Sequence, residues 1–361
     1  MVYLHVPFCK SFCTYCDFYS EICSPWDSAR VQKLFVDQVC EEIDRRREEI
    51  AAAADIRTLY VGGGTPSLLS ADVLGRIVRH LDGGSYDEFT VEVNPDDIVA
   101  RGEDYVSDLL GIGVNRFSMG VQSMDDGILK WMNRRHGSAE AAEAFRILRA
   151  GGVDNISVDL IFGLSQVSLE SWRDTVGRIL ELRPEHISAY QLSIEDGSAL
   201  AGMVRSGRYA EATQEHCREQ YDLLCRMLHG AGYVHYEVSN FALPGREAVH
   251  NSAYWTRSPY VGLGPGAHSF DGRCRSWNSQ SLTAYSREFE TLSPEDVRIE
   301  TLMLGLRTSR GLDEAAANCL ADAAALADMI SEGALVHSPG GRLRIPEDRF
   351  FVSDDIIRAL I

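Results

Sequence analysis

Three cysteines, Cys9, Cys13 and Cys16, stand close together near the start of the sequence. Their spacing, C-x3-C-x2-C, lets one short loop present three thiolates to a single inorganic centre. Thiolates are soft ligands that select iron–sulfur clusters, zinc or copper, and a cubane 4Fe-4S cluster normally takes four cysteines. Three ligands leave one iron open, and an open iron can chelate the amino and carboxylate groups of S-adenosylmethionine (SAM). The loop therefore predicts a 4Fe-4S cluster whose electron cleaves the sulfonium of bound SAM.

A structural zinc ion is the alternative, with His5 or Cys23 as its fourth ligand. Zinc sites usually pair two C-x2-C knuckles, and the sequence contains no second knuckle, so the spacing favours the cluster. The remaining cysteines stand singly in helical or loop patterns, where we expect small buried hydrophobes: Cys40, Cys217, Cys225, Cys274 and Cys319.

A glycine run, Gly62-Gly63-Gly64-Thr65, follows the second predicted strand. Glycine lets backbone approach a ligand closely because no Cβ intrudes. Alone, the run could be a tight turn between a strand and a helix. Because the cysteine loop follows the preceding strand, the two together predict a cofactor pocket that includes Gly63, Gly64 and Thr65.

Polar side chains mark the next three strands. Glu92 ends the third strand, where its carboxylate can accept hydrogen bonds from a ribose or an ammonium group. Gln122 follows the fourth strand, and Arg134 beyond it can clamp a carboxylate bidentately. Asp159 lies within the apolar fifth strand. A charge there indicates a site, although a buried structural pair is the alternative.

Six short runs rich in β-branched and aromatic residues must position these side chains. They alternate with helical patterns, which predicts parallel pairing with right-handed crossovers in an α/β sheet or barrel. Ligands of such folds bind at the carboxyl ends of the strands. The six predicted strands are Val2–Val6, Ile56–Val61, Phe89–Val93, Asn115–Val121, Ile156–Phe162 and His186–Leu192.

The βα rhythm stops after about residue 205, which predicts three parts. Residues 1–205 form the barrel, 206–293 a connecting segment, and 294–361 a C-terminal unit of helices and a hairpin around Pro339-Gly340-Gly341. The order of elements in this unit suggests a winged helix. Because the unit is not notably basic, we expect it to pack or dock a partner. The charged run 44–49 is expected to be a solvated helix face.

The composition bounds the partners and the compartment. The 361 residues carry a formal charge of -18, which argues against nucleic-acid binding. No export signal precedes the first strand and no apolar window approaches about 20 residues, so we expect a cytoplasmic protein without a membrane span. Peripheral membrane association is left open, and the oligomeric state cannot be read from the sequence. Nine cysteines, an odd count, favour metal or redox chemistry over disulfides.

These motifs together resemble those of the radical SAM coproporphyrinogen III oxidase-like family, over nearly the whole chain. Within it the sequence is most similar to the HemW group of haem chaperones. The resemblance implies an α/β fold, a radical SAM partial (β/α)6 TIM-like barrel, with a 4Fe-4S cluster on the three cysteines. It also implies a SAM site formed by Tyr3, Gly63, Gly64, Thr65, Glu92, Gln122, Arg134, Asp159 and Ser193.

Two departures separate this chain from the oxidases of that family. The oxidases carry a further cysteine two residues past the third cluster ligand, where this chain has Phe18, and a longer segment before the first strand. Residues 250–255 instead match the HNxxYW motif of the HemW group. A neutral imidazole is a good axial ligand for haem iron, so His250 is expected to bind haem. A histidine packed in an aromatic corner is the alternative, and His268 is a weaker candidate for a second ligand.

The resemblance thus implies a haem chaperone that binds haem, the cluster and SAM, and delivers haem to acceptor proteins such as respiratory enzymes. Whether SAM is cleaved in that task stays open. The alternative is a coproporphyrinogen III oxidase, which decarboxylates its substrate to protoporphyrinogen IX by radical chemistry. A non-enzymatic binding module held by zinc is the third interpretation.

Overall fold

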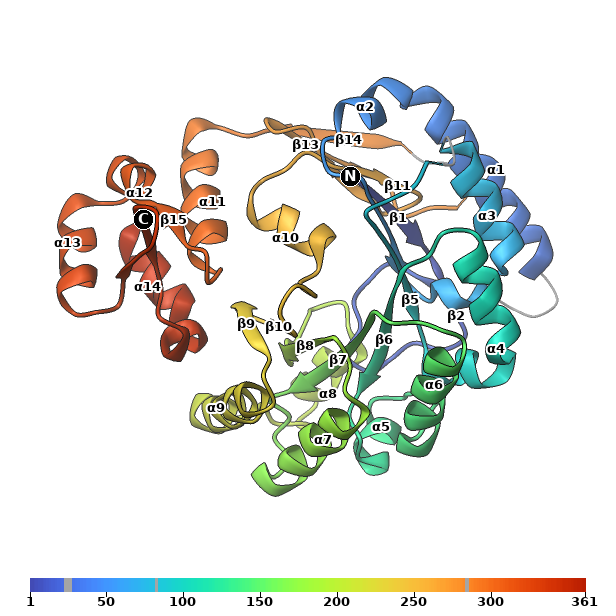
Figure 1. Cartoon of the computed structure of the whole chain (residues 1–361), viewed down its shortest axis with the longest axis horizontal. Coiled ribbons are helices and arrows are strands. Elements are labelled where there is room, and N and C mark those ends of the chain that lie inside the picture. The colour runs from blue at the N-terminus through green and yellow to red at the C-terminus, as the bar shows by residue number, and fades with distance from the viewer. Residues whose placement is uncertain (23–27, 82–83, 283–285) are drawn as a thin grey trace.

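A curved sheet forms the centre of the molecule (Figure 1). In the computed structural model, which describes residues 1–22, 28–81, 84–282 and 286–361, this sheet has nine strands in the order β11-β1-β4-β5-β6-β7-β8-β10-β9. Strands β11 through β8 run parallel, and β10 and β9 continue the sheet antiparallel. The bounds are β1 Val2–Val6, β4 Thr58–Gly63, β5 Glu88–Val93, β6 Arg116–Gln122, β7 Ile156–Phe162, β8 His186–Gln191, β9 Val234–Glu237, β10 Asn240–Ala242 and β11 Val261–Leu263.

The six predicted strands are β1 and β4 to β8, so the predicted parallel α/β arrangement is confirmed. The helices between them cover the outer, convex face of the sheet (Figure 1). Side-chain caps fix several helix starts; Ser70 Oγ, for example, accepts from the amide of Val73. The helices are α1 Ser28–Arg45, α2 Arg47–Ala52, α3 Ala71–His80, α4 Pro95–Gly111, α5 Asp126–Trp131, α6 Ser138–Ala150, α7 Leu169–Leu182, α8 Ala199–Arg205 and α9 Gln214–Gly230, with a 3-10 turn at Pro66–Leu68.

Each barrel strand alternates between an apolar face and a polar face. On β6, Phe117 and Met119 are fully buried beneath the helices, whereas Arg116 and Ser118 line the cavity inside the barrel. Parallel register keeps the polar face continuous, because Thr90 pairs with Arg116 and Gly120 pairs with Asp159. The barrel interior is therefore polar, and the apolar core lies between the sheet and its helices.

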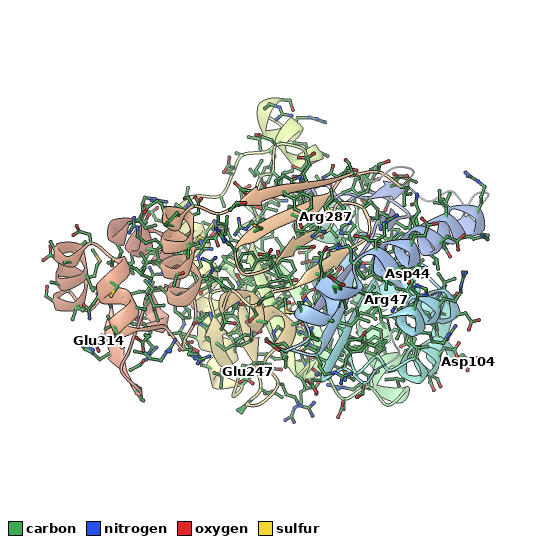
Figure 2. All side chains as sticks on the ribbon, turned by 90° about the horizontal axis from the view of Figure 1, so that it is seen from above. Asp44, Arg47, Asp104, Glu247, Arg287 and Glu314 are labelled. Carbon is green, nitrogen blue, oxygen red and sulfur yellow. The ribbon has the colours of Figure 1, made fainter. Side chains whose placement is uncertain are left out.

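The segment 206–293 contributes strands to both edges of the sheet. Strands β9 and β10 extend one edge and β11 extends the other, after the helix α10 Val249–Trp255. A separate antiparallel sheet follows, made of β12 His268–Phe270, β13 Cys274–Asn278 and β14 Arg287–Thr291. Figure 2 labels Arg287 of β14 and, on the neighbouring helices α1 and α2, Asp44 and Arg47; Arg287 pairs with Glu49 of α2 at 2.8 Å.

The charged run 44–49 is not entirely a solvated face, and this prediction was wrong for Arg46. The Arg46 guanidinium is buried, pairs with Glu42 at 2.8 Å, and donates to the carbonyl oxygen of Gly262 at 2.7 Å and to Ser269 Oγ at 2.8 Å. The break between α1 and α2 turns this side chain inward, where it ties α1 to β11. A buried guanidinium is tolerated because these partners satisfy its donors.

The C-terminal unit, residues 294–361, stands beside the barrel (Figure 1). It contains α11 Pro294–Leu306, β15 Leu312–Asp313, α12 Glu314–Leu320, α13 Ala323–Ser331, β16 Val336–Ser338, β17 Arg342–Arg344, a 3-10 turn Glu347–Val352 and α14 Ser353–Leu360. The unit contacts the sheet where the amide of Val238 donates to the carbonyl oxygen of Arg307 at 3.0 Å. The division into three parts and the winged-helix-like character of this unit stay predictions. No helix within the described residues is long and apolar enough to cross a membrane.

Candidate functional site

The cysteine loop lies between two short paired strands, β2 Phe8–Cys9 and β3 Glu21–Ile22. Contacts with the α5–α6 connection hold it, because the Thr14 amide donates to the Met132 carbonyl oxygen at 3.0 Å and Asn133 Nδ2 donates to the Phe12 carbonyl oxygen at 2.7 Å. The loop thereby faces the carboxyl ends of the barrel strands. Cys9, Cys13 and Cys16 all line a cavity of about 680 Å³ there, which we call the barrel cavity.

Most residues predicted to surround SAM line this same cavity. Tyr3 does not, although its ring stacks on Tyr60, which does, with 6.1 Å between ring centroids. The Tyr3 hydroxyl lies 3.1 Å from His5 Nδ1, so Tyr3 forms the layer beneath the lining. The predicted residues that line the cavity are Gly63, Gly64, Thr65, Glu92, Gln122, Arg134, Asp159 and Ser193.

Gly64 shows why the glycine run is needed here. A Cβ built on Gly64 would lie 2.7 Å from the carbonyl oxygen of Phe8 and 3.1 Å from Cys9 Sγ. Cys9 Sγ also lies 3.5 Å from Thr65 Oγ1. Strand β4 therefore approaches the cysteine loop so closely that only glycine fits. The predicted link between the glycine run and the cysteines is a direct contact.

Arg134 connects the cysteine loop to the barrel wall. Its Nη2 donates to Asn94 Oδ1 at 2.7 Å and to the Gly120 carbonyl oxygen at 2.5 Å, while Nη1 lies 3.5 Å from Cys13 Sγ. Its buried Nε–H has no partner among the described residues. Since buried donors are almost always satisfied, this orphan N–H fits an acceptor that occupies the cavity.

The thiols fit a cluster better than a single ion. Among the described residues, no three His, Cys, Asp or Glu side chains converge closely enough to hold one metal ion, whereas a cubane spreads its ligands over separate irons. Cys23, the alternative zinc ligand, lies outside the described residues. Burial raises the pKa of Cys16 to about 11, so this thiol is protonated at neutral pH in the metal-free protein.

The strands also bring polar side chains into the barrel cavity that the sequence analysis did not single out, namely Tyr60, Arg116 and Ser118. Glu92 Oε1 accepts from the Tyr60 hydroxyl at 2.8 Å, and Asp159 accepts from Ser118 Oγ. Arg116 is buried in the same cavity, and its Nε has no partner in the described part of the chain. The alternation Arg116-x-Ser118-x-Gly120-x-Gln122 could have revealed these residues, because period-two polarity in a parallel strand indicates a polar barrel interior.

Gln122 is held in an unusual backbone conformation. Its φ of 70° lies in the left-handed region that favours glycine, and the pairing of β6 with β7 shifts register between Gly120 and Gln122. Such a conformation costs about 1–3 kcal/mol in a residue other than glycine and concentrates at functional sites. The shift ends regular pairing at the cavity wall and re-aims the Gln122 side chain into the cavity.

Glu92 gives a first testable prediction, on stability. Burial raises its pKa from 4.5 to about 7, although hydrogen bonds from Tyr60 and Gly63 oppose the shift. Between these two pH values the unfolded chain ionises while the folded chain keeps the proton, so stability falls as pH rises. Glu92→Gln cannot ionise. At pH 8 the unfolding free energy of the variant should therefore exceed that of the wild type by at most about 3 kcal/mol. The actual difference should be smaller than this limit, because the Glu92 side chain faces a solvent-accessible cavity.

Urea unfolding of the metal-free protein at pH 5 and pH 8 measures this difference. The advantage of Glu92→Gln should be small at pH 5 and largest above pH 7, because wild-type Glu92 ionises in between. Glu181→Gln, on the exposed side of α7, is the control and should show no such trend. An equal difference at both pH values would mean that the Glu92 carboxyl does not titrate in this range.

His250 is buried rather than presented to a ligand. Its side chain lies on α10, 1% exposed, with Nδ1 2.8 Å from Thr58 Oγ1 and Nε2 3.0 Å from the Tyr254 hydroxyl. Burial lowers its pKa to about 3, which keeps the imidazole neutral. Both ring nitrogens thus have hydrogen-bond partners. In this structure His250 is a histidine packed in an aromatic corner, which was the alternative interpretation of the sequence. Ligation of haem iron by His250 stays a prediction, and it would require the ring to leave one of these partners.

Two further residues singled out in the sequence lie apart from His250. His268, on β12, stacks on Trp277 with 6.0 Å between ring centroids and does not line the barrel cavity. Phe18 does line it and is 73% exposed, so the position of the oxidases' additional cysteine carries an apolar side chain at the cavity mouth. Phe12, 54% exposed, lies on the same loop and also lines the cavity.

Comparison with known proteins places this geometry in context. The model of the radical SAM superfamily matches residues 3–179. The protein named heme chaperone HemW of Lactococcus lactis is 33% identical over 324 residues, which cover 86% of this chain and 82% of that protein. The protein of the same name from Mycobacterium tuberculosis is 31% identical over 377 residues, which cover 100% of this chain and 94% of that protein.

Among solved structures, the coproporphyrinogen III oxidase HemN of Escherichia coli, described as a radical SAM enzyme, superposes with a TM-score of 0.80. The match covers 99% of this chain and 89% of that chain at 20% sequence identity. At this identity the likeness establishes the fold alone. It confirms the partial barrel that the sequence predicted.

Proposed function

Because this chain belongs to the HemW family of radical SAM proteins, we propose that it is a haem chaperone, which binds haem together with a 4Fe-4S cluster and SAM. It hands the haem to acceptor proteins, for which respiratory enzymes are our candidates. The supporting observation is that three cysteines, an unsatisfied arginine donor and two partly buried carboxylates share one cavity. A cytoplasmic location stays part of this proposal.

The residues divide into two groups by position. Cys9, Cys13 and Cys16 would hold the cluster, which supplies an electron and one open iron when bound. Beside the cysteines, Arg134 would bind the SAM carboxylate, and Glu92, on β5, would accept from the ribose or the ammonium group of SAM. The other residues proposed to surround SAM are Tyr3, Gly63, Gly64, Thr65, Gln122, Asp159 and Ser193.

The alternative is radical decarboxylation of coproporphyrinogen III. This chain shares the fold of the Escherichia coli oxidase, but it has Phe18 at the position where the oxidases carry their additional cysteine. An exposed phenyl ring can neither ligate iron nor donate a hydrogen atom as a thiol can. This residue favours the chaperone over the oxidase.

One pair of anaerobic assays separates these functions. We expect reconstituted protein to give a saturable Soret change when titrated with haem, because haem is the cargo. The same protein with SAM, reductant and coproporphyrinogen III should form no protoporphyrinogen IX. Stoichiometric and rapid product formation would overturn the chaperone assignment, as would the absence of any Soret change. Colourless anaerobic protein that contains zinc would instead support the zinc-held binding module.

A further inference from the structure

A second cavity, of about 490 Å³, opens between the barrel and the C-terminal unit. Its walls come from α10, from α11 and the turn after it, and from β17. Figure 1 shows α10 between the barrel strands and α11, and Figure 2 labels Glu247, one of the residues of the wall. The volume falls within the range of small-molecule sites.

The second cavity is basic although the chain as a whole is acidic. Three arginines line it, Arg257, Arg310 and Arg342, against the single carboxylate of Glu247, in a chain whose formal charge is -18. Part of the Arg257 charge is offset by Glu300 at 3.4 Å, outside the lining. The remaining positive charge is concentrated on Arg310 and Arg342. Such a concentration suits an anionic ligand.

The Arg342 guanidinium is held in position by backbone. Its Nε donates to the carbonyl oxygen of Arg310 at 3.0 Å, and Nη2 donates to that of Gly311 at 2.5 Å. Gly311 has φ 71°, and a Cβ there would lie 2.2 Å from the Leu343 carbonyl oxygen, so only glycine allows this turn. The turn brings Arg310 beside Arg342. The Arg310 side chain is exposed and has no partner among the described residues.

Aromatic and apolar side chains line the second cavity together with these arginines. The Trp255 indole lines the second cavity from α10, together with Leu312 of β15. A partly exposed indole offers a large flat surface for stacking, and guanidinium groups recognise carboxylates bidentately. The combination fits a planar aromatic ligand that carries carboxylates.

Given the proposed haem-chaperone function, on which this step rests, we infer that the second cavity binds the porphyrin of haem. The macrocycle stacks on Trp255, and its propionates pair with Arg310 and Arg342. No histidine, cysteine or methionine is among the described lining residues, so the cavity recognises the ring and its propionates rather than the iron. The acceptor protein can then supply the iron ligands.

Two further observations support this assignment. Tyr236 also lines the second cavity, but burial raises its pKa, and its hydroxyl lies 2.8 Å from His186 Nε2, so the phenol stays neutral and is a poor iron ligand. Helix α10 presents Asn251 to the barrel cavity and Ser252 and Trp255 to the second cavity. The bound porphyrin would thus lie one short helix away from the proposed SAM site.

The test titrates the full-length protein, purified anaerobically, with haem, with iron-free protoporphyrin IX and with the dimethyl ester of that porphyrin. Soret absorbance and Trp fluorescence report binding. We expect both free-acid porphyrins to bind the wild type, and Arg310→Glu to weaken that binding on the order of tenfold. The ester should bind the wild type more weakly, and Arg310→Glu should hardly change its affinity. Trp255→Leu should weaken the binding of all three ligands.

The control is Arg358→Ala, which removes an exposed arginine of α14 that pairs with Asp355. This variant should bind all three ligands like the wild type. Thermal unfolding checks that each variant folds. The second cavity is not the porphyrin site if the wild type binds haem and both cavity variants keep the wild-type affinity. It is also not the site if the wild type binds haem but not iron-free porphyrin. In either case the proposed chaperone function stands. If the wild type binds no haem at all, the proposed function fails, and this inference fails with it.

Discussion

Replacing Cys9, Cys13 or Cys16 by alanine is expected to abolish cluster binding in each single variant. Each substitution leaves two thiols for a cluster that already has one iron without a cysteine ligand. All three side chains line the barrel cavity, and no replacement thiol lines it among the described residues. Iron, acid-labile sulfide and visible absorption after anaerobic reconstitution measure the loss.

The control for the cysteine series is Cys40→Ala. Cys40 is a partly buried residue on α1 that does not line the barrel cavity, so its removal should leave iron and sulfide unchanged. An equal loss in Cys40→Ala would indicate general misfolding. Full retention of iron in any of the three loop variants would show that the ligand set is different.

Replacing Arg134 by lysine is expected to weaken SAM binding by about 10- to 100-fold while the cluster stays bound. The lysine keeps a positive charge near Cys13 but loses the planar guanidinium, its contacts with Asn94 and Gly120, and the unpaired Nε–H. Equilibrium dialysis of SAM against anaerobically reconstituted protein, with iron determined in the same sample, measures both quantities.

Arg149→Lys is the matched control, because Arg149 also forms a partly buried ion pair, with Glu185, away from the barrel cavity. We expect its SAM affinity to equal that of the wild type. An unchanged affinity in Arg134→Lys would remove this residue from the SAM site. Loss of iron in Arg134→Lys would instead show that Arg134 supports cluster binding through its contact with Cys13.

Local patterns sufficed to predict the strands and the cysteine loop. Runs of five and seven residues, rich in β-branched and aromatic residues and bounded by turns, identified β1 and β7 with their observed bounds, because such residues favour strands. The resemblance to the HemW group is confirmed by the relatives at 31–33% identity. Residues at or just past the carboxyl end of a strand, such as Glu92 and Gly64, could be assigned to one cavity because parallel strands end at one edge.

Contacts between distant segments could not be predicted in the same way. Arg46 resembles its exposed neighbours in sequence, and only the docking of β11 beside α1 buries it. His250 depends likewise on Thr58, which is 192 residues away, and on the packing of α10 against the barrel. The second cavity joins α10, α11 and β17, and no local pattern relates Trp255 to Arg342.

The most direct test of the central claim is electron paramagnetic resonance of the reduced, anaerobically reconstituted protein, with and without SAM. We predict about four iron and four sulfide per chain and a spectrum that changes when SAM is added, because one iron has no protein ligand. Protein that contains no acid-labile sulfide after reconstitution, or a cluster whose spectrum SAM leaves unchanged, would contradict it.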